Sequence, residues 1–137
     1  MRPRSLTWLL LGLLAILAAR RWLDVVEVRG RSMAPTLLPG DRLLVGRLGS
    51  PRVGQIVVAS DPRDAGRELI KRVAAHDRSG VTLRGDNAVA STDTRAFGRL
   101  PAEAIAWRAV LRYWPPGRIG RVNPARSPRA MTRLPTR

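Results

Sequence analysis

Two residues of this sequence have side chains suited to nucleophilic catalysis. Ser32 lies in Gly-Arg-Ser-Met-Ala, residues 30–34, and Lys71 lies in Glu-Leu-Ile-Lys-Arg-Val, residues 68–73. A neutral lysine can accept the proton of a serine hydroxyl and later return it to a leaving amine, which is the logic of a Ser-Lys dyad. Taken singly, each residue is also consistent with an ordinary solvated side chain.

The neighbours of Lys71 favour a buried amine. On a strand, Leu69, Lys71 and Val73 share one face, so the lysine belongs to an apolar row. Burial disfavours the ammonium form, and lowering its pKa from about 10.4 to about 8 corresponds to about 3 kcal/mol. The alternative is an edge-strand lysine that extends its amine to water.

Composition narrows the chemistry further. Cysteine is absent, which excludes thiolate nucleophiles, and His76 is the one histidine, so the usual zinc sites cannot form and neither a metal nor a cofactor is expected. As a rival base, His76 lies in a turn-like segment typical of a solvated side chain. Of the 25 basic residues only Lys71 is a lysine, which indicates either a role that arginine cannot fill or chance.

A third polar segment, residues 85–98, could support the pair. Gly85, Asp86 and Asn87 predict a tight turn, and short polar side chains follow. Such groups could hold a lysine amine on its nucleophile. The alternative is a polar loop with an ion pair between Asp93 and Arg95.

An apolar segment begins the chain. Arginine pairs flank the 14 apolar-rich residues 6–19, which as a helix would reach about 21 Å. Because a bilayer core measures about 30 Å, a single span requires tilting or local thinning. We expect residues 1–23 to form a signal anchor. A cleaved signal peptide is disfavoured because no Ala-x-Ala ends the run, and a buried helix is the remaining alternative.

Short strands are expected after this segment, at 25–28, 42–45, 55–59, 68–73, 81–84 and 104–113. Turn residues separate them, which predicts a compact all-β barrel or sandwich over residues 24–114. The proline and arginine content of residues 115–137 predicts a disordered tail.

Four segments in this order resemble the conserved boxes of the bacterial signal peptidase I family. Residues 32–37 resemble the nucleophile box, 40–45 the next box, 71–73 the general-base box and 85–98 the final box. The resemblance covers roughly residues 25–113. It implies an all-β, signal-peptidase-like domain on one N-terminal transmembrane or signal-anchor helix.

The resemblance also implies a function, a serine endopeptidase that removes N-terminal leader peptides after small residues. Its site would comprise Ser32 as nucleophile, Lys71 as base, Ser91, Asp93 and Arg95 as supporting residues, Met33 and Pro35 at the substrate, and Gly85, Asp86 and Asn87 as a structural motif. The peptide would bind as an added β-strand. The implied partners are a precursor protein with a leader peptide and the lipids of a cell membrane, crossed once, with the catalytic domain outside the cytoplasm.

Other readings remain open. Ala-Ser-Thr-Asp at 90–93 and Arg-Tyr-Trp-Pro at 112–115 resemble the family member that matures nickel-type superoxide dismutase, which would make the chain a dedicated maturation protease. A self-cleaving repressor is disfavoured because Ala65-Gly66 lies downstream of the serine. A non-catalytic membrane- or nucleic-acid-binding module is suggested by the net charge of +15. The arginines are spread along the chain, which disfavours nucleic acid.

Overall fold

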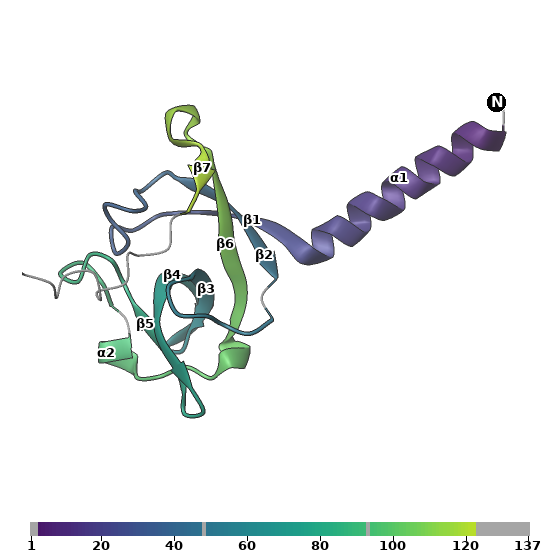
Figure 1. Ribbon diagram of the computed structural model, residues 1–137. Helices are drawn as coiled ribbons and strands as arrows, with labels where there is room; N and C mark the ends of the chain where they lie inside the picture. The colour runs from purple at the N-terminus through teal and green to yellow at the C-terminus, as the bar shows by residue number, and fades with distance from the viewer. Residues whose placement is uncertain (1–2, 48, 93, 123–137) are drawn as a thin grey trace, which may run out of the picture.

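The computed structural model describes residues 3–47, 49–92 and 94–122, in which an N-terminal helix leads into an antiparallel sheet (Figure 1). The elements are α1 (Pro3–Trp22), β1 (Leu23–Glu27), β2 (Arg42–Arg47), β3 (Ile56–Asp61), β4 (Asp64–Asp77), β5 (Gly80–Arg84), α2 (Thr94–Phe97), the 3-10 turn η1 (Ala102–Ala104), β6 (Ile105–Trp114), the 3-10 turn η2 (Pro116–Arg118) and β7 (Gly120–Arg121).

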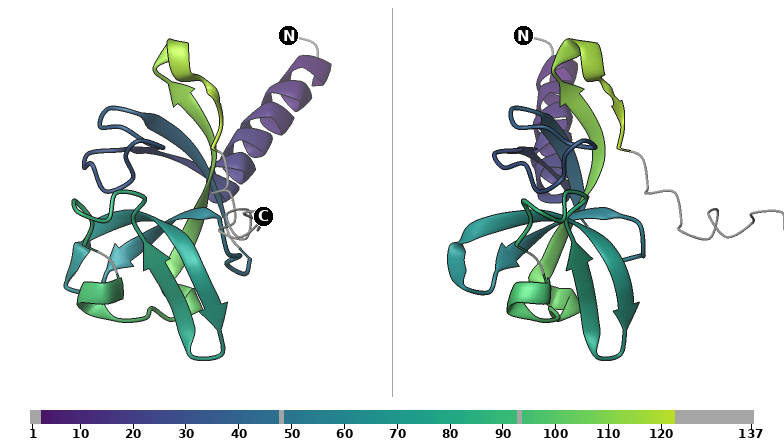
Figure 2. Two further views of the ribbon diagram at one scale, coloured as in Figure 1. Left: turned by 60° about the vertical axis from the view of Figure 1, so that its left-hand side comes forward. Right: turned by 90° about the vertical axis from the view of Figure 1, so that its left-hand side faces the viewer.

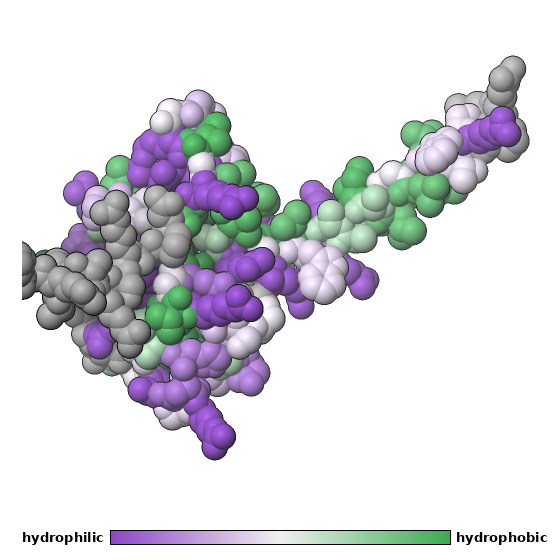
Figure 3. All heavy atoms as spheres, viewed as in Figure 1, coloured by the Kyte–Doolittle hydropathy of each residue, from purple (hydrophilic) through white to green (hydrophobic). Residues whose placement is uncertain are grey.

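Helix α1 stands away from the domain (Figure 1). Its 20 residues correspond to about 30 Å, which is longer than the apolar run alone predicts. Residues 4–22 are exposed, and hydrophobic side chains gather along the middle of the helix on the face shown in Figure 3. By length and composition α1 could cross a membrane. It ends at Trp22, and β1 begins at the next residue.

The strands form one sheet in the order β1-β2-β6-β3-β4-β5, with β7 added to β6, and every neighbouring pair is antiparallel. The six predicted strands are all present, with β4 extended to 14 residues. Strand β6 runs from the η1 end of the domain to β7, while the β4–β5 hairpin lies at the opposite end from β7 (Figure 2). Strand β1 comes first in the strand order and directly follows helix α1, so it is an edge strand next to the helix.

Strand β3 separates two hydrophobic clusters. Val58 belongs to a cluster with Met33 and Leu43, whereas Val57 belongs to a second cluster with Leu83. Successive residues of a strand point to opposite faces, so β3 is buried on both sides. Its continuous apolar run is typical of such a strand.

The structure differs from the sequence expectation after β6. Residues 116–121, assigned to a disordered tail by composition, form η2 and β7. Arg118 pairs with the buried Asp41 at 2.9 Å, a contact 77 positions away that composition cannot indicate. Residues 123–137 of the expected tail lie outside the described residues.

Candidate active site

Ser32 lies in the loop 28–41 between β1 and β2, which we call the nucleophile loop. Its base is closed by two bonds: the Val28 amide donates to the Asp41 carbonyl at 2.8 Å, and the Gly40 amide donates to the Val28 carbonyl at 2.8 Å. Met33, beside the serine, is 1% exposed and packs in the first cluster. The loop is thus fixed on the domain although it has no regular secondary structure around Ser32.

Lys71 lies on β4 and points into the protein. It is 3% exposed, and its strand neighbours on the same face, Leu69 and Val73, are 6% and 1% exposed. The prediction that this row is buried is confirmed. The Lys71 Nζ donates to the Ser91 Oγ at 3.0 Å, so a hydroxyl from a distant loop orients the amine.

The turn after β5 brings these two parts together. The Asn87 amide donates to the Ser32 carbonyl at 2.8 Å. A Cβ added at Gly85 would lie 2.5 Å from that same carbonyl oxygen and would overlap the Ser91 Oγ. Only glycine fits between them, because any Cβ would force the nucleophile loop and the lysine support apart.

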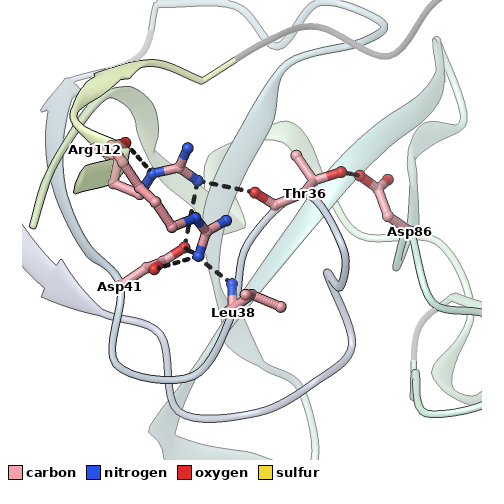
Figure 4. Close-up of polar contacts among 6 residues, drawn as sticks. Thr36, Leu38, Asp41, Asp86 and Arg112 are labelled. Atoms are coloured by element: carbon pink, nitrogen blue, oxygen red, sulfur yellow. Dashed lines mark hydrogen bonds and ion pairs between the residues drawn. The ribbon is translucent and has the colours of Figure 1, made fainter. Parts of the chain in front are cut away.

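Asp86 bridges the nucleophile loop and β4. Its carboxylate accepts the Arg72 Nε at 2.8 Å and Nη2 at 2.6 Å. It also accepts the Thr36 Oγ1 at 2.6 Å (Figure 4). Partial burial opposes ionisation of Asp86, but the hydrogen bonds from Arg72 and Thr36 prevail and hold its pKa below the usual value. Since Arg72 follows Lys71, this bridge connects the loop of the serine to the strand of the lysine.

The sequence reading placed Asp86 in a structural motif but missed its partners. Thr36 lies in the segment that resembles the nucleophile box, and Arg72 lies in the segment that resembles the general-base box. Their membership of these segments was the available signal. Their pairing spans 50 and 14 positions respectively, so only the fold could reveal it.

A groove of about 800 Å³ runs past Ser32 and Lys71. It is lined by residues 25–29 of β1 and the nucleophile loop and by residues 64–71 of β4. Met33, Ala90 and Thr92 also line it. The two candidate catalytic residues therefore share one open channel.

The remaining predicted site residues do not all lie on the groove. Pro35 is exposed and does not line the groove. Asp93 lies outside the described residues, and so does the side chain of Arg95. The rival base His76 also lies away from the groove, where its Nδ1 is 2.8 Å from the Pro51 carbonyl. Within residues 3–47, 49–92 and 94–122 no cluster of three potential metal ligands occurs.

Comparison with known proteins identifies the class of this protein as a serine peptidase. The family model described as signal peptidase, peptidase S26, matches residues 4–82. The chain is 33% identical to the mitochondrial ATP-independent inner membrane protease subunit 1a of Arabidopsis thaliana, covering 72% of this chain and 74% of the relative. It is 32% identical to the mitochondrial inner membrane protease subunit 1 of Xenopus tropicalis, covering 67% and 70%, and 28% identical to the probable signal peptidase I-1 of Synechocystis, covering 67% and 71%.

The chain belongs to the signal peptidase I family, peptidase S26. At the level of the family its activity is the cleavage of leader peptides, and its substrates are precursor proteins that carry them. Its relatives are membrane-bound peptidases. The family assignment expected from the four sequence boxes is confirmed.

Proposed function

We propose that this protein removes N-terminal leader peptides after small residues, with Ser32 as nucleophile and Lys71 as general base. The observation that carries the proposal is the burial of Lys71, at 3% exposure, on the same groove as Ser32. A buried amine lacks the water that stabilises its ammonium form, so its neutral form is favoured and can accept a proton.

The chemistry follows from these positions. The Lys71 Nζ accepts the proton of the Ser32 hydroxyl while the Ser32 Oγ attacks the scissile carbonyl carbon. The proton then passes to the leaving amine, and the C–N bond breaks to leave an ester on Ser32. Water, deprotonated by Lys71, hydrolyses this ester and restores the serine. Ser91 supports this cycle by holding the amine at 3.0 Å, and Asp93 and Arg95 complete the support.

The developing oxyanion needs a hydrogen-bond donor. The amide of Ser32 is the natural donor at this place. Some family members carry a hydroxyl side chain two residues before the nucleophile. This chain has Gly30 there, which offers no side-chain donor, so its oxyanion hole depends on backbone amides. The Asn87 bond to the Ser32 carbonyl fixes the peptide plane that follows the serine.

The substrate binds as an extended strand in the groove. Strand β1 pairs with β2 alone among the described strands, so its other edge faces the groove and can accept a peptide by strand addition. Met33 follows the nucleophile directly and lines the groove, so it borders the pocket for the residue before the cut, whereas Pro35 does not line the groove and is not assigned to this pocket. Ile70, half-buried in the lining of the groove, limits the size of side chains that enter.

The domain is anchored to a membrane by residues 1–23, and residues 24–122 form the catalytic domain outside the cytoplasm. Helix α1 continues into β1 without a linker, so the domain lies against the bilayer. Near this junction, exposed Leu23 and Val110 lie together beside Gly46. Such apolar groups suit a lipid surface, and the net charge of +15 favours anionic lipids over a neutral surface.

The proposal is tested by incubating the full chain in detergent with a peptide precursor whose apolar leader ends in Ala-x-Ala. Intact mass should show one cut after the second alanine. Ser32→Ala should abolish the cut. Lys71→Arg and Lys71→Met should abolish it too, because neither side chain can take the serine proton. Normal cleavage by either lysine variant would contradict the mechanism.

Two controls make this test specific. Thermal unfolding of each variant must match the parent, so that loss of folding is not read as loss of chemistry. A precursor with leucine in place of the last alanine should resist the parent enzyme, which tests the preference for small residues. Membrane orientation is read separately from a reporter fused after residue 137 that is active on one side only.

A further inference from the structure

The segment after β6 folds back onto the nucleophile loop. Strand β7 pairs with β6 through Arg121 opposite Leu111 and Gly120 opposite Arg112. The turn η2 lies between these strands and presents Arg118 to the loop. This segment, residues 115–121, contributes nothing to the lining of the groove.

Asp41 is the point where the returning segment meets the loop. The residue is 2% exposed, and its carboxylate accepts the Leu38 amide at 2.9 Å within the loop. The same carboxylate receives the Arg118 Nη1 at 2.9 and 3.1 Å and the Arg112 Nη1 at 3.3 Å (Figure 4). A buried carboxylate is costly unless it is paired, so these two arginines stabilise the base of the loop.

Arg112 also holds the other side of the loop. Its Nη1 donates to the Thr36 carbonyl at 3.0 Å, and its Nε donates to the Arg118 carbonyl at 2.6 Å (Figure 4). One guanidinium thus joins the nucleophile loop to the returning segment. The planar group with its several donors suits this task, and a lysine could not reproduce it.

Thr36 lies four residues after Ser32 and is held from both sides. Its carbonyl accepts Arg112, while its hydroxyl donates to Asp86, which Arg72 holds in turn. A continuous chain of polar contacts therefore runs from residues 115–121, across the nucleophile loop, to the strand of Lys71.

We infer that residues 115–121 form a clasp that fixes the nucleophile loop and that Arg118 is a positioning residue for Ser32. The inference rests on the proposed function, in which Ser32 must face Lys71. Arg118 does not line the groove and acts through Asp41 and Arg112. Without its charge, Asp41 keeps only the longer ion pair, and the loop can shift.

The test compares Arg118→Gln with the parent, as full chains in detergent, on the same Ala-x-Ala precursor. We expect kcat to fall by about 10-fold or more with KM nearly unchanged, because a displacement of about 1 Å in a reacting group can cost about 100-fold. Arg118→Lys should recover part of the rate, since its ammonium can still pair with Asp41. The control is Arg121→Gln, an exposed arginine in the same segment, which should retain the parental rate.

A positioning role is separated from general destabilisation in two ways. Rates are measured at a temperature where thermal unfolding shows every variant to be folded. The double variant Asp41→Asn with Arg118→Gln should be no slower than the slower single variant, because both changes break one contact. Multiplied losses would contradict the pairing.

Other outcomes would overturn the inference. Arg118→Gln with parental kcat, or with a raised KM alone, would show that the clasp does not position Ser32. Ser32→Ala, run beside it, distinguishes the two levels. If Ser32→Ala is inactive while Arg118→Gln is normal, the proposed function stands and the clasp fails. If Ser32→Ala still cleaves, the proposed function itself fails.

Discussion

The serine and the lysine are held by different means. Lys71 belongs to β4, where strand pairing with β3 and two buried neighbours fix its direction. Ser32 belongs to an irregular loop, which is fixed by separate hydrogen bonds with Asn87, Asp86, Arg112 and Arg118. Many backbone hydrogen bonds together fix the position of a residue in a paired strand. The position of a residue in an irregular loop depends on each of a few separate hydrogen bonds. Changes near the lysine should therefore reduce stability, and changes at the loop contacts should reduce the rate per folded molecule.

Apart from substitutions of Ser32 and Lys71 themselves, the largest effect on the rate is expected at the contact between these two regions. Gly85→Ala puts a Cβ 2.5 Å from the Ser32 carbonyl and onto the Ser91 Oγ. We expect kcat to fall by about 100-fold, with a loss of stability of about 1–3 kcal/mol. Cleavage of the Ala-x-Ala precursor and urea unfolding measure the two quantities.

The matched control is Gly49→Ala, because a Cβ there would meet nothing within 4 Å. It should leave both quantities at the parental level. A fully active Gly85→Ala enzyme would mean that the turn after β5 does not set the position of Ser32.

The second prediction addresses the strand side. Leu83 is 0% exposed in the cluster beneath β4, and Leu83→Ala should lower the free energy of unfolding by about 2–5 kcal/mol. The rate per folded molecule should change little, since no contact of the loop is touched. Val89→Ala, at a fully exposed position (100%), should change stability by less than about 0.5 kcal/mol. A large fall in kcat for folded Leu83→Ala would contradict the expectation that changes on the strand side affect stability and not the rate.

The third prediction adds a group to the loop. A Cβ at Gly30 meets nothing within 4 Å, so Gly30→Ser should be accommodated and place a hydroxyl near the expected oxyanion. Because one such donor can be worth about 100-fold or more where it is well aligned, a gain in kcat on the order of 10-fold is expected from an unoptimised one. Gly30→Ala separates the hydroxyl from the Cβ. Equal rates for the two variants would place the oxyanion elsewhere.

The smallest effect is expected from acid. Hydrogen bonds from the Arg63 side chain and backbone lower the pKa of Asp61 from 3.8 to about 2. A carboxylate with a lowered pKa stabilises the fold above its unfolded pKa, and this contribution is lost as the pH falls through the folded value. Stability should therefore decline between about pH 4 and pH 2.

Asp61 closes the β3–β4 hairpin, so it belongs to the strand side. Asp61→Asn should flatten the decline measured by thermal unfolding in this pH range and leave cleavage at neutral pH unchanged. An unaltered decline would assign it to the other carboxylates whose pKa is lowered, Asp77 and Asp86.

The order of the strands along the chain and the inward direction of Lys71 could be predicted because both follow from local patterns. The alternation around Lys71 and the continuous apolar run of β3 each reflect burial of a strand. The contacts that hold Ser32 could not be predicted. Thr36 meets Asp86 across 50 positions, and Arg118 meets Asp41 across 77, and no periodicity relates residues so far apart. The composition of residues 115–121 even pointed away from order.

The sequence by itself determined the chemistry available: one lysine, one histidine, no cysteine, a serine in a loop and an apolar segment before it. These are properties of residue types and local spacing, and together with the resemblance of four ordered segments to the signal peptidase I boxes they predict a Ser-Lys peptidase on an anchor. Only the tertiary structure decided that Gly85 lies between the Ser32 carbonyl and Ser91, and that Arg118 of η2 pairs with Asp41 at the base of the nucleophile loop. Those features depend on close approach of distant segments, which arises when the whole sheet packs and is written in no single stretch of residues.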